Sequence, residues 1–219
     1  MTSLILVRHG ETDWNRQRRI QGSTDIPLNN DGRAQAADAA RHLRDILDPD
    51  APVAMAASDL GRARETAQII ADALGVGGVG VYPDLRERAY GEAEGLRPEE
   101  FSERWGSWDR AEVPGAEAWP DVRRRALRGL RSAVGDARSR TAPGRSTVVV
   151  VSHGALIREV IRHASAGEFP LDGERLPNGS IHRLRFEHDH LSLLSYEAAE
   201  DALRMTATTE AVAPAGRTA

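Results

Sequence analysis

The run of four consecutive valines, Val148–Val151, constrains the fold of this chain more than any other feature. A strand with one face in water alternates apolar and polar residues, and the strand predicted over Thr147–Val151 shows no such alternation. Shorter apolar runs at Leu4–Val7, Val53–Ala57 and Val79–Tyr82 predict three more strands. Because amphipathic helical segments separate these runs, we predict an α/β fold in which helices cover both faces of a mostly parallel sheet.

Helical periodicity and capping residues predict helices between the strands. Asn29 is expected to cap a helix that runs to Leu47, and Ser58 and Asp59 are expected to cap the next helix. The remaining predicted elements are a short helix near 98–105, helices over about 120–137 and 155–163, and two late antiparallel edge strands at 181–186 and 191–196.

The composition excludes several classes of chemistry. The chain has no cysteine, which rules out disulfides, thiolate catalysis and cysteine-based zinc sites. All 29 basic residues are arginine, so Schiff-base and P-loop chemistry, which need lysine, are excluded as well. The formal net charge of −4 argues against general nucleic-acid binding. The N-terminal apolar run is too short for a signal sequence or a membrane span, so we expect a cytoplasmic protein without a membrane partner.

Chemically reactive side chains follow each of the four predicted parallel strands. Ligands of open parallel sheets bind at the carboxyl ends of the strands, so these side chains are expected to converge on one edge. Arginine matches phosphate oxygens with two parallel hydrogen bonds, a histidine can attack phosphorus, and a carboxylic acid can protonate the leaving oxygen. The pattern therefore predicts phosphoryl transfer without a metal ion. The residues that carry it are Arg8, His9, Arg62, Glu87 and His153.

Four sequence blocks resemble, in order, the signatures of the histidine phosphatase superfamily, also called the phosphoglycerate mutase-like family. The blocks are LVRHGETDWN, SDLGRARETA, LRERAYGEAEG and VSHGALIR, and LPNGSI from Leu176 resembles a weaker fifth block. The resemblance implies a three-layer α/β/α sandwich and no metal or other cofactor. We expect a single domain over 1–205, with a cap-like excursion at about 91–119, and a disordered tail over 206–219.

The resemblance also implies a role for each reactive side chain. His9 is expected to be the nucleophile that becomes phosphorylated, and it must be neutral to attack. Arg8, Arg62 and His153 are expected to bind the phosphoryl group. Glu87 is expected to be the general acid, and then the base that activates water.

Three further positions are expected to contact the substrate. Asn15 would donate to a phosphate oxygen, and Gln21 would lie near the substrate. Gly154, like Gly10, follows a predicted strand, and its lack of a side chain would let the backbone come close to the substrate. The expected partner is a small phosphorylated substrate, and a homodimer remains open.

Three functions compete: a phosphatase, a cofactor-dependent phosphoglycerate mutase, and a non-catalytic binder of phosphorylated ligands. The absence of lysine, the short block PGAEAWPDV and Ala155 after the second HG favour the phosphatase. ERAYG instead resembles the mutase form of its block. The binder is disfavoured because no catalytic position is missing. The substrate stays open among sugar phosphates, phosphoglycerate derivatives, α-ribazole phosphate and secondary metabolites, because the excursion that would select it departs from the family pattern at Ala116 and Ala118.

Overall fold

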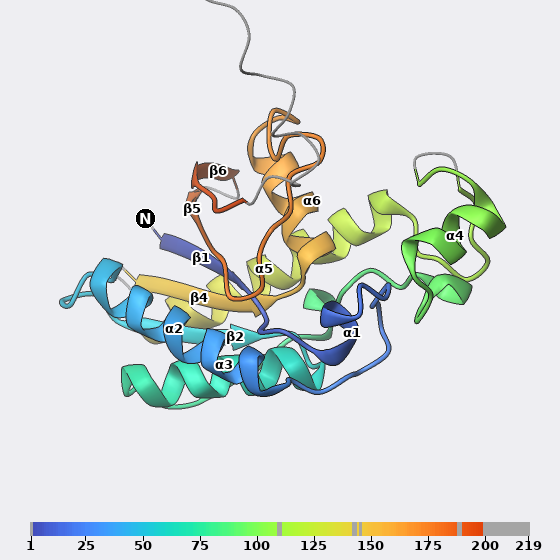
Figure 1. Cartoon of the computed structure of the whole chain (residues 1–219). Coiled ribbons are helices and arrows are strands. Elements are labelled where there is room, and N and C mark those ends of the chain that lie inside the picture. The colour runs from blue at the N-terminus through green and yellow to red at the C-terminus, as the bar shows by residue number, and fades with distance from the viewer. Residues whose placement is uncertain (1, 109–110, 142–143, 145, 188–189, 199–219) are drawn as a thin grey trace, which may run out of the picture.

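A computed structural model of the chain describes residues 2–108, 111–141, 144, 146–187 and 190–198. The tail predicted over 206–219 lies outside these residues. Figure 1 shows a central sheet with helices packed on both sides of it.

Six strands form one sheet in the order β3-β2-β4-β1-β5-β6. The first four strands in the chain pair in parallel, whereas β5 pairs antiparallel with β1 and with β6. The mostly parallel sheet is therefore confirmed. Both late strands were predicted to be edge strands, but β5 is an inner strand and only β6 lies at an edge. The strands are β1 (Thr2–Arg8), β2 (Val53–Ala57), β3 (Val79–Val81), β4 (Ser146–Ser152), β5 (Ile181–Glu187) and β6 (His190–Ser195).

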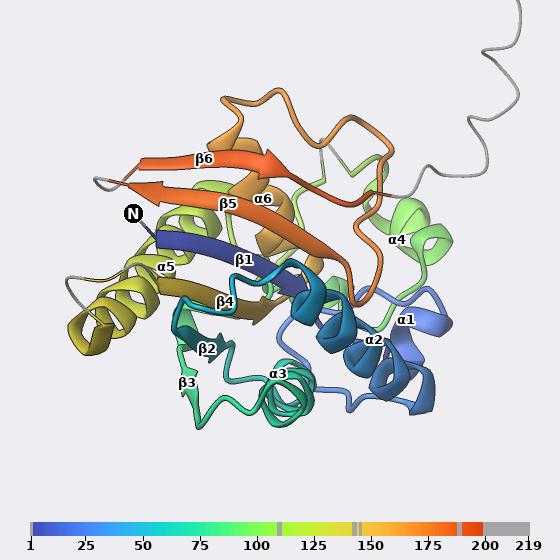
Figure 2. The same cartoon turned by 90° about the vertical axis from the view of Figure 1, so that its left-hand side faces the viewer.

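The helices divide between the two faces of the sheet, with α2 and α3 on one face and α5 and α6 on the other, as Figure 2 shows. Two 3-10 turns, at Pro83–Leu85 and Gly91–Ala93, flank the loop that carries Glu87. The helices are α1 (Asp13–Arg16), α2 (Asn30–Ile46), α3 (Gly61–Leu74), α4 (Pro98–Trp105), α5 (Trp119–Thr141) and α6 (Gly154–Ala164).

The four valines of β4 explain why this sheet needs two helical layers. Val148 and Val150 pack in the cluster formed with α5 and α6, whereas Val149 and Val151 pack in the cluster formed with α2 and α3. All four side chains are completely buried. Burial of each contributes about 1.5–3 kcal/mol, so both layers are required to stabilise this strand.

The two helices with predicted caps behave differently. Asn29 caps α2 as predicted, and its side chain accepts a hydrogen bond from the Gly32 amide. The prediction for α3 is wrong, because that helix begins at Gly61, and Leu60 is its N-cap residue. The Asp25 carboxylate instead accepts from the Gly61 amide at 2.6 Å, so the cap comes from a different loop.

The described residues of 91–119, which we call the cap segment, lie beyond the sheet at the end where β1 and β4 end (Figure 1). Phe101 anchors this segment, because its ring stacks on Trp108 with ring centroids 3.9 Å apart. The Ile20 amide donates to the Leu96 carbonyl, and the Gly95 amide donates to the Ile20 carbonyl, each at 2.8 Å. These bonds attach the cap segment to the loop after α1, beside which α4 lies in both views (Figures 1 and 2). Among the described helices, none is long and apolar enough to cross a membrane.

Candidate active site

The carboxyl edge of the sheet brings the predicted residues together. Arg8 is the last residue of β1 and pairs with Ser152, the last residue of β4. His9 and His153 follow these two strands, and their ring centroids lie 5.1 Å apart. Arg62 lies in the first turn of α3 and hydrogen-bonds to the His9 ring. The expectation that these side chains converge is met.

His9 is held as a neutral imidazole with one reactive nitrogen. Its Nδ1 lies 2.7 Å from the Gly10 carbonyl oxygen, to which it can only donate. The proton therefore sits on Nδ1, and the Nε2 lone pair accepts from Arg62 Nε at 3.3 Å. Burial, followed by the charges of Arg62 and Arg8, holds the pKa of His9 well below its ordinary value. These features are what a nucleophilic histidine needs.

Gly10 permits the close packing that places His9. A Cβ at this position would lie 2.2 Å from the Gly32 carbonyl oxygen, at the start of α2. The Gly10 amide also donates to Thr66 Oγ1 on α3 at 3.1 Å. The residue after His9 therefore lies against both α2 and α3, and no side chain fits there.

Arg62 is completely buried, and its guanidinium is positioned by the loop before α2. Its two terminal nitrogens donate to the carbonyl oxygens of Gly22 and Thr24, at 2.7 and 2.9 Å. The Glu94 carboxylate holds the same loop, because it accepts from the amides of Ser23 and Thr24 at 2.9 and 2.8 Å. The cap segment therefore contributes to the placement of Arg62.

Arg8 and His153 present buried nitrogens without partners. In the described part of the chain, Arg8 Nε and both ring nitrogens of His153 have no hydrogen-bond partner. Burial, followed by the charges of Arg62 and His9, keeps the pKa of His153 well below its ordinary value, so the ring offers one N–H donor. Gly154 leaves room for this arrangement, because a Cβ there would lie 3.3 Å from Arg8 Nε.

Glu87 is bound to the N-terminus of α6. Its carboxylate accepts from the amides of Ala155 and Leu156, at 2.9 and 3.0 Å, and from the Arg88 amide at 2.9 Å. Since His153 does not cap α6 with its side chain, Glu87 supplies that cap from another part of the chain. The carboxylate thus binds amides two and three residues after His153, in the first turn of α6.

Asn15 and Gln21 lie together beside the His9 backbone. Asn15 Nδ2 donates to Gln21 Oε1 at 3.2 Å, and Asn15 Oδ1 accepts from the Thr12 amide at 3.2 Å. Gln21 Nε2 is buried and lacks a partner among the described residues. Of the two amide side chains, Gln21 is therefore the one that presents a donor without a partner.

Sequence reasoning assigned no role to Asn178, although it noted the LPNGSI block that contains it. Asn178 Nδ2 donates to the His9 carbonyl oxygen at 2.9 Å and to Asn15 Oδ1 at 3.2 Å. The residue therefore links the loop before β5 to the backbone of His9. The block itself was the signal that could have identified it.

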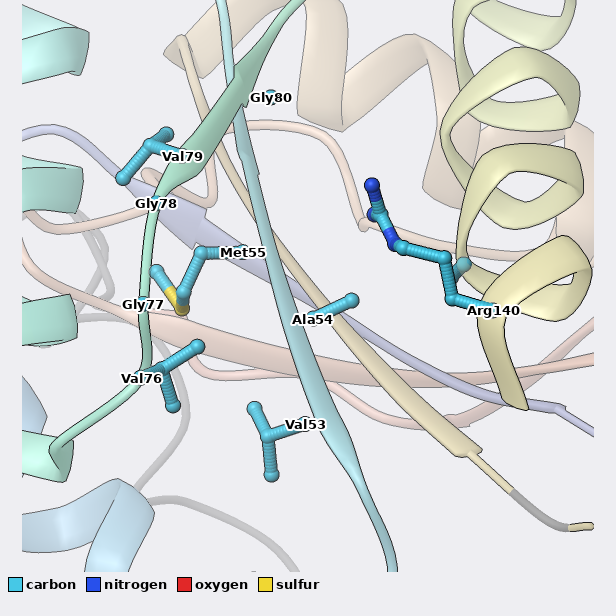
Figure 3. A pocket seen from close by; sticks show the side chains of 10 residues that line it. Val53, Ala54, Met55, Val76, Gly77, Gly78, Val79, Gly80 and Arg140 are labelled. Atoms are coloured by element: carbon cyan, nitrogen blue, oxygen red, sulfur yellow. The ribbon is translucent and has the colours of Figure 1, made fainter.

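A cavity of about 350 Å³ lies far from these residues, at the amino ends of β2 and β3. Figure 3 shows the side chains of Val53, Met55 and Val76 on one side of β2, and those of Ala54 and Arg140 on its other side. Arg140 is the one charged residue among those that line it. The cavity holds none of the predicted catalytic residues and lies at the opposite end of the parallel strands, so we do not assign the reaction to it.

Comparisons with known proteins agree with the site. The family model described as histidine phosphatase superfamily (branch 1) matches residues 4–199. Over 196 residues the chain is 35% identical to a Bacillus subtilis protein named uncharacterized phosphatase PhoE, covering 90% of this chain and 94% of that one. Over 195 residues it is 34% identical to the probable phosphoglycerate mutase GpmB of Erwinia tasmaniensis, covering 84% and 85%.

A solved structure gives the same result for the fold. Phosphoserine phosphatase from Entamoeba histolytica, in complex with 3-phosphoglyceric acid, superposes with a TM-score of 0.69 and 29% identity. The match covers 91% of this chain and 98% of that chain, so the three-layer arrangement is shared throughout. Relatives of this chain thus include both phosphatases and mutases that handle small phosphorylated molecules. The chain belongs to the histidine phosphatase superfamily, branch 1.

Proposed function

We propose that this protein is a metal-independent phosphomonoesterase that hydrolyses a small phosphorylated metabolite through a phosphohistidine at His9. One observation carries the proposal. Among the described residues, five buried side-chain atoms lack a hydrogen-bond partner, and four of them are nitrogens of Arg8, Gln21 and His153. Buried polar groups rarely remain unpaired, and the His153 ring lies 5.1 Å from the His9 ring, centroid to centroid. A phosphoryl group bound there would supply acceptor oxygens for Arg8 Nε, for Gln21 Nε2 and for the one protonated ring nitrogen of His153.

The reaction has two steps with the same acid-base residue. His9 Nε2 forms a bond to phosphorus while the ester P–O bond breaks, and Glu87 transfers its proton to the departing oxygen. Water then attacks the phosphohistidine and gives a proton to the Glu87 carboxylate. Inorganic phosphate leaves and His9 is restored. The charges of Arg8 and Arg62 stabilise the charge that spreads over the transferring group.

A phosphoglycerate mutase is the second candidate, because the mutase GpmB is a relative of similar identity to the phosphatase relatives. A mutase has to return the phosphoryl group to its substrate before water attacks. The chain has no lysine to help hold a second anionic group. We therefore favour hydrolysis of the phosphoenzyme over return of the phosphoryl group.

A phosphoester panel at neutral pH, with a metal chelator present, tests the proposal. The wild type should release phosphate from 4-nitrophenyl phosphate, and His9→Ala should abolish the release. His42→Ala is the matched control, since His42 is an exposed histidine on α2. Turnover that survives in His9→Ala, or that disappears on chelation, would overturn the mechanism.

The same panel separates the alternatives. Incubation with 3-phosphoglycerate and its bisphosphate should yield little 2-phosphoglycerate, and efficient interconversion would establish the mutase instead. Stoichiometric binding of a phosphoester without any turnover would identify a non-catalytic binding protein.

A further inference from the structure

We propose that Arg125, on α5, is a positioning residue that fixes the backbone around Glu87, and that Glu117 locks Arg125 in place. The inference rests on the proposed role of Glu87 as the acid and base. Arg125 belongs to a run of three arginines on α5, Arg123–Arg125, and a run of like charges on a helix usually faces solvent. Its side chain is only 15% exposed, however, so it does not belong to a solvated face.

All five N–H donors of Arg125 are used within the protein. Nε and one terminal nitrogen bind the two Glu117 carboxylate oxygens, at 2.7 and 2.8 Å. The other terminal nitrogen donates to the carbonyl oxygens of Asp84 and Arg86, at 3.0 and 2.5 Å. The last donor reaches the Glu87 carbonyl oxygen at 3.0 Å. Guanidinium has five such donors in a rigid plane, so the side chain is saturated.

These contacts complete the support of the acid residue. The Glu87 side chain is held at its carboxylate by the N-terminus of α6. Arg125 holds the main chain of the same residue and of two residues before it. Glu87 is therefore fixed at both ends. A general acid depends on such placement, because an error of about 1 Å in a catalytic group can cost roughly a hundredfold in rate.

Glu117 connects this support to the cap segment. Its amide donates to the Ala89 carbonyl oxygen at 2.9 Å, and its carbonyl oxygen accepts from Arg88 Nε at 2.8 Å. The end of the cap segment is thereby fastened to the residues directly after Glu87. The cap segment and the loop that carries Glu87 are consequently held by one set of contacts.

The dependence on the leaving group tests the inference. 4-Nitrophenolate leaves without much protonation, whereas an alkoxide needs the proton from Glu87. The value of kcat/KM reports the steps up to and including the first irreversible step, which is departure of the leaving group. It is therefore measured for 4-nitrophenyl phosphate and for the alkyl phosphate of the panel that is hydrolysed best. The variants are Arg125→Lys, which keeps the positive charge near His153, and Glu117→Gln.

Both variants should lower kcat/KM for the alkyl phosphate about tenfold and for the aryl phosphate less than about threefold. Glu87→Gln should show the same selectivity to a larger degree, about a hundredfold or more. Arg128→Lys is the matched control, because Arg128 lies one turn further along α5 and binds the Asp84 side chain instead of backbone oxygens. It should change neither value by more than about twofold.

Equal losses for the two substrates in Arg125→Lys and Glu117→Gln would show a merely structural role and overturn the inference, as would no loss in either variant. Thermal unfolding of each variant shows whether it is folded. If Arg125→Lys does not fold, the selectivity of Glu117→Gln between the two substrates decides the question. A wild type that hydrolyses neither substrate would refute the proposed function itself, which is a different outcome.

Discussion

Acidification should destabilise this protein through a histidine outside the active site. His182, on β5, is completely buried, and its Nε2 lies 3.0 Å from Ser180 Oγ. Its Nδ1 accepts from the Glu197 amide at 3.3 Å, so the ring is bound in its neutral form. Burial, with a smaller effect of Arg8, lowers the pKa of His182 from 6.5 to about 4.

The sign and the size follow from proton linkage. Because the folded-state pKa lies below that of the unfolded chain, the unfolded state binds more protons between pH 6.5 and 4. The stability that neutral His182 provides is therefore present above pH 6.5 and lost as the pH falls. Between pH 7 and pH 5 the loss comes to about 2 kcal/mol.

Urea denaturation at pH 7 and pH 5 measures this loss against a variant that does not titrate there. Wild type should be more stable than His182→Gln at pH 7, and that advantage should shrink by about 2 kcal/mol at pH 5. Leu184→Val, a core change on the same strand, is the control, and its deficit should be equal at both pH values. An advantage over His182→Gln that is independent of pH would refute the reasoning.

Three further changes probe the site. Glu94→Gln should lower kcat/KM about tenfold for aryl and alkyl phosphates alike, because the loop that positions Arg62 loosens; a selective loss would contradict this. Gly10→Ala should cost at least about 2 kcal/mol in urea denaturation, since the new Cβ would overlap the Gly32 carbonyl. Gln21→Leu should weaken inhibition by inorganic phosphate about five- to tenfold, and an unchanged inhibition constant would remove Gln21 from the phosphate site.

Local patterns of the sequence predicted most of the fold. Each apolar run became a strand; the run of β4 is buried on both faces, whereas Val81, at the end of the edge strand β3, is 45% exposed. The four strands pair in parallel as the alternation with helices predicts. The Asn29 cap was also predictable, since it depends only on residues of the same turn.

The remaining features depend on contacts between segments that are distant in the sequence, and the hydrophobic periodicity of the sequence does not reveal such contacts. The cap of α3 comes from Asp25, 36 residues before the amide it binds. In the sequence, nothing distinguishes Arg125 from the other arginines of α5. In the described part of the structure, it alone among them donates to the Glu87 carbonyl oxygen. The same limit explains why the candidate catalytic residues could be proposed from their positions after strands, whereas the residues that contact and orient them could not.

The helix caps supplied by Asp25 and Glu87 link the starts of α3 and α6 to loops from other parts of the chain. The helix α3 carries Arg62, and the helix α6 follows His153. The N-terminus of each is capped by a carboxylate from a remote loop. Release of either loop would expose amides at the helix start and displace a reactive residue in the same event. Exchange of the Ala155 and Leu156 amides with solvent should therefore accompany the loss of activity, because both amides bind the Glu87 carboxylate.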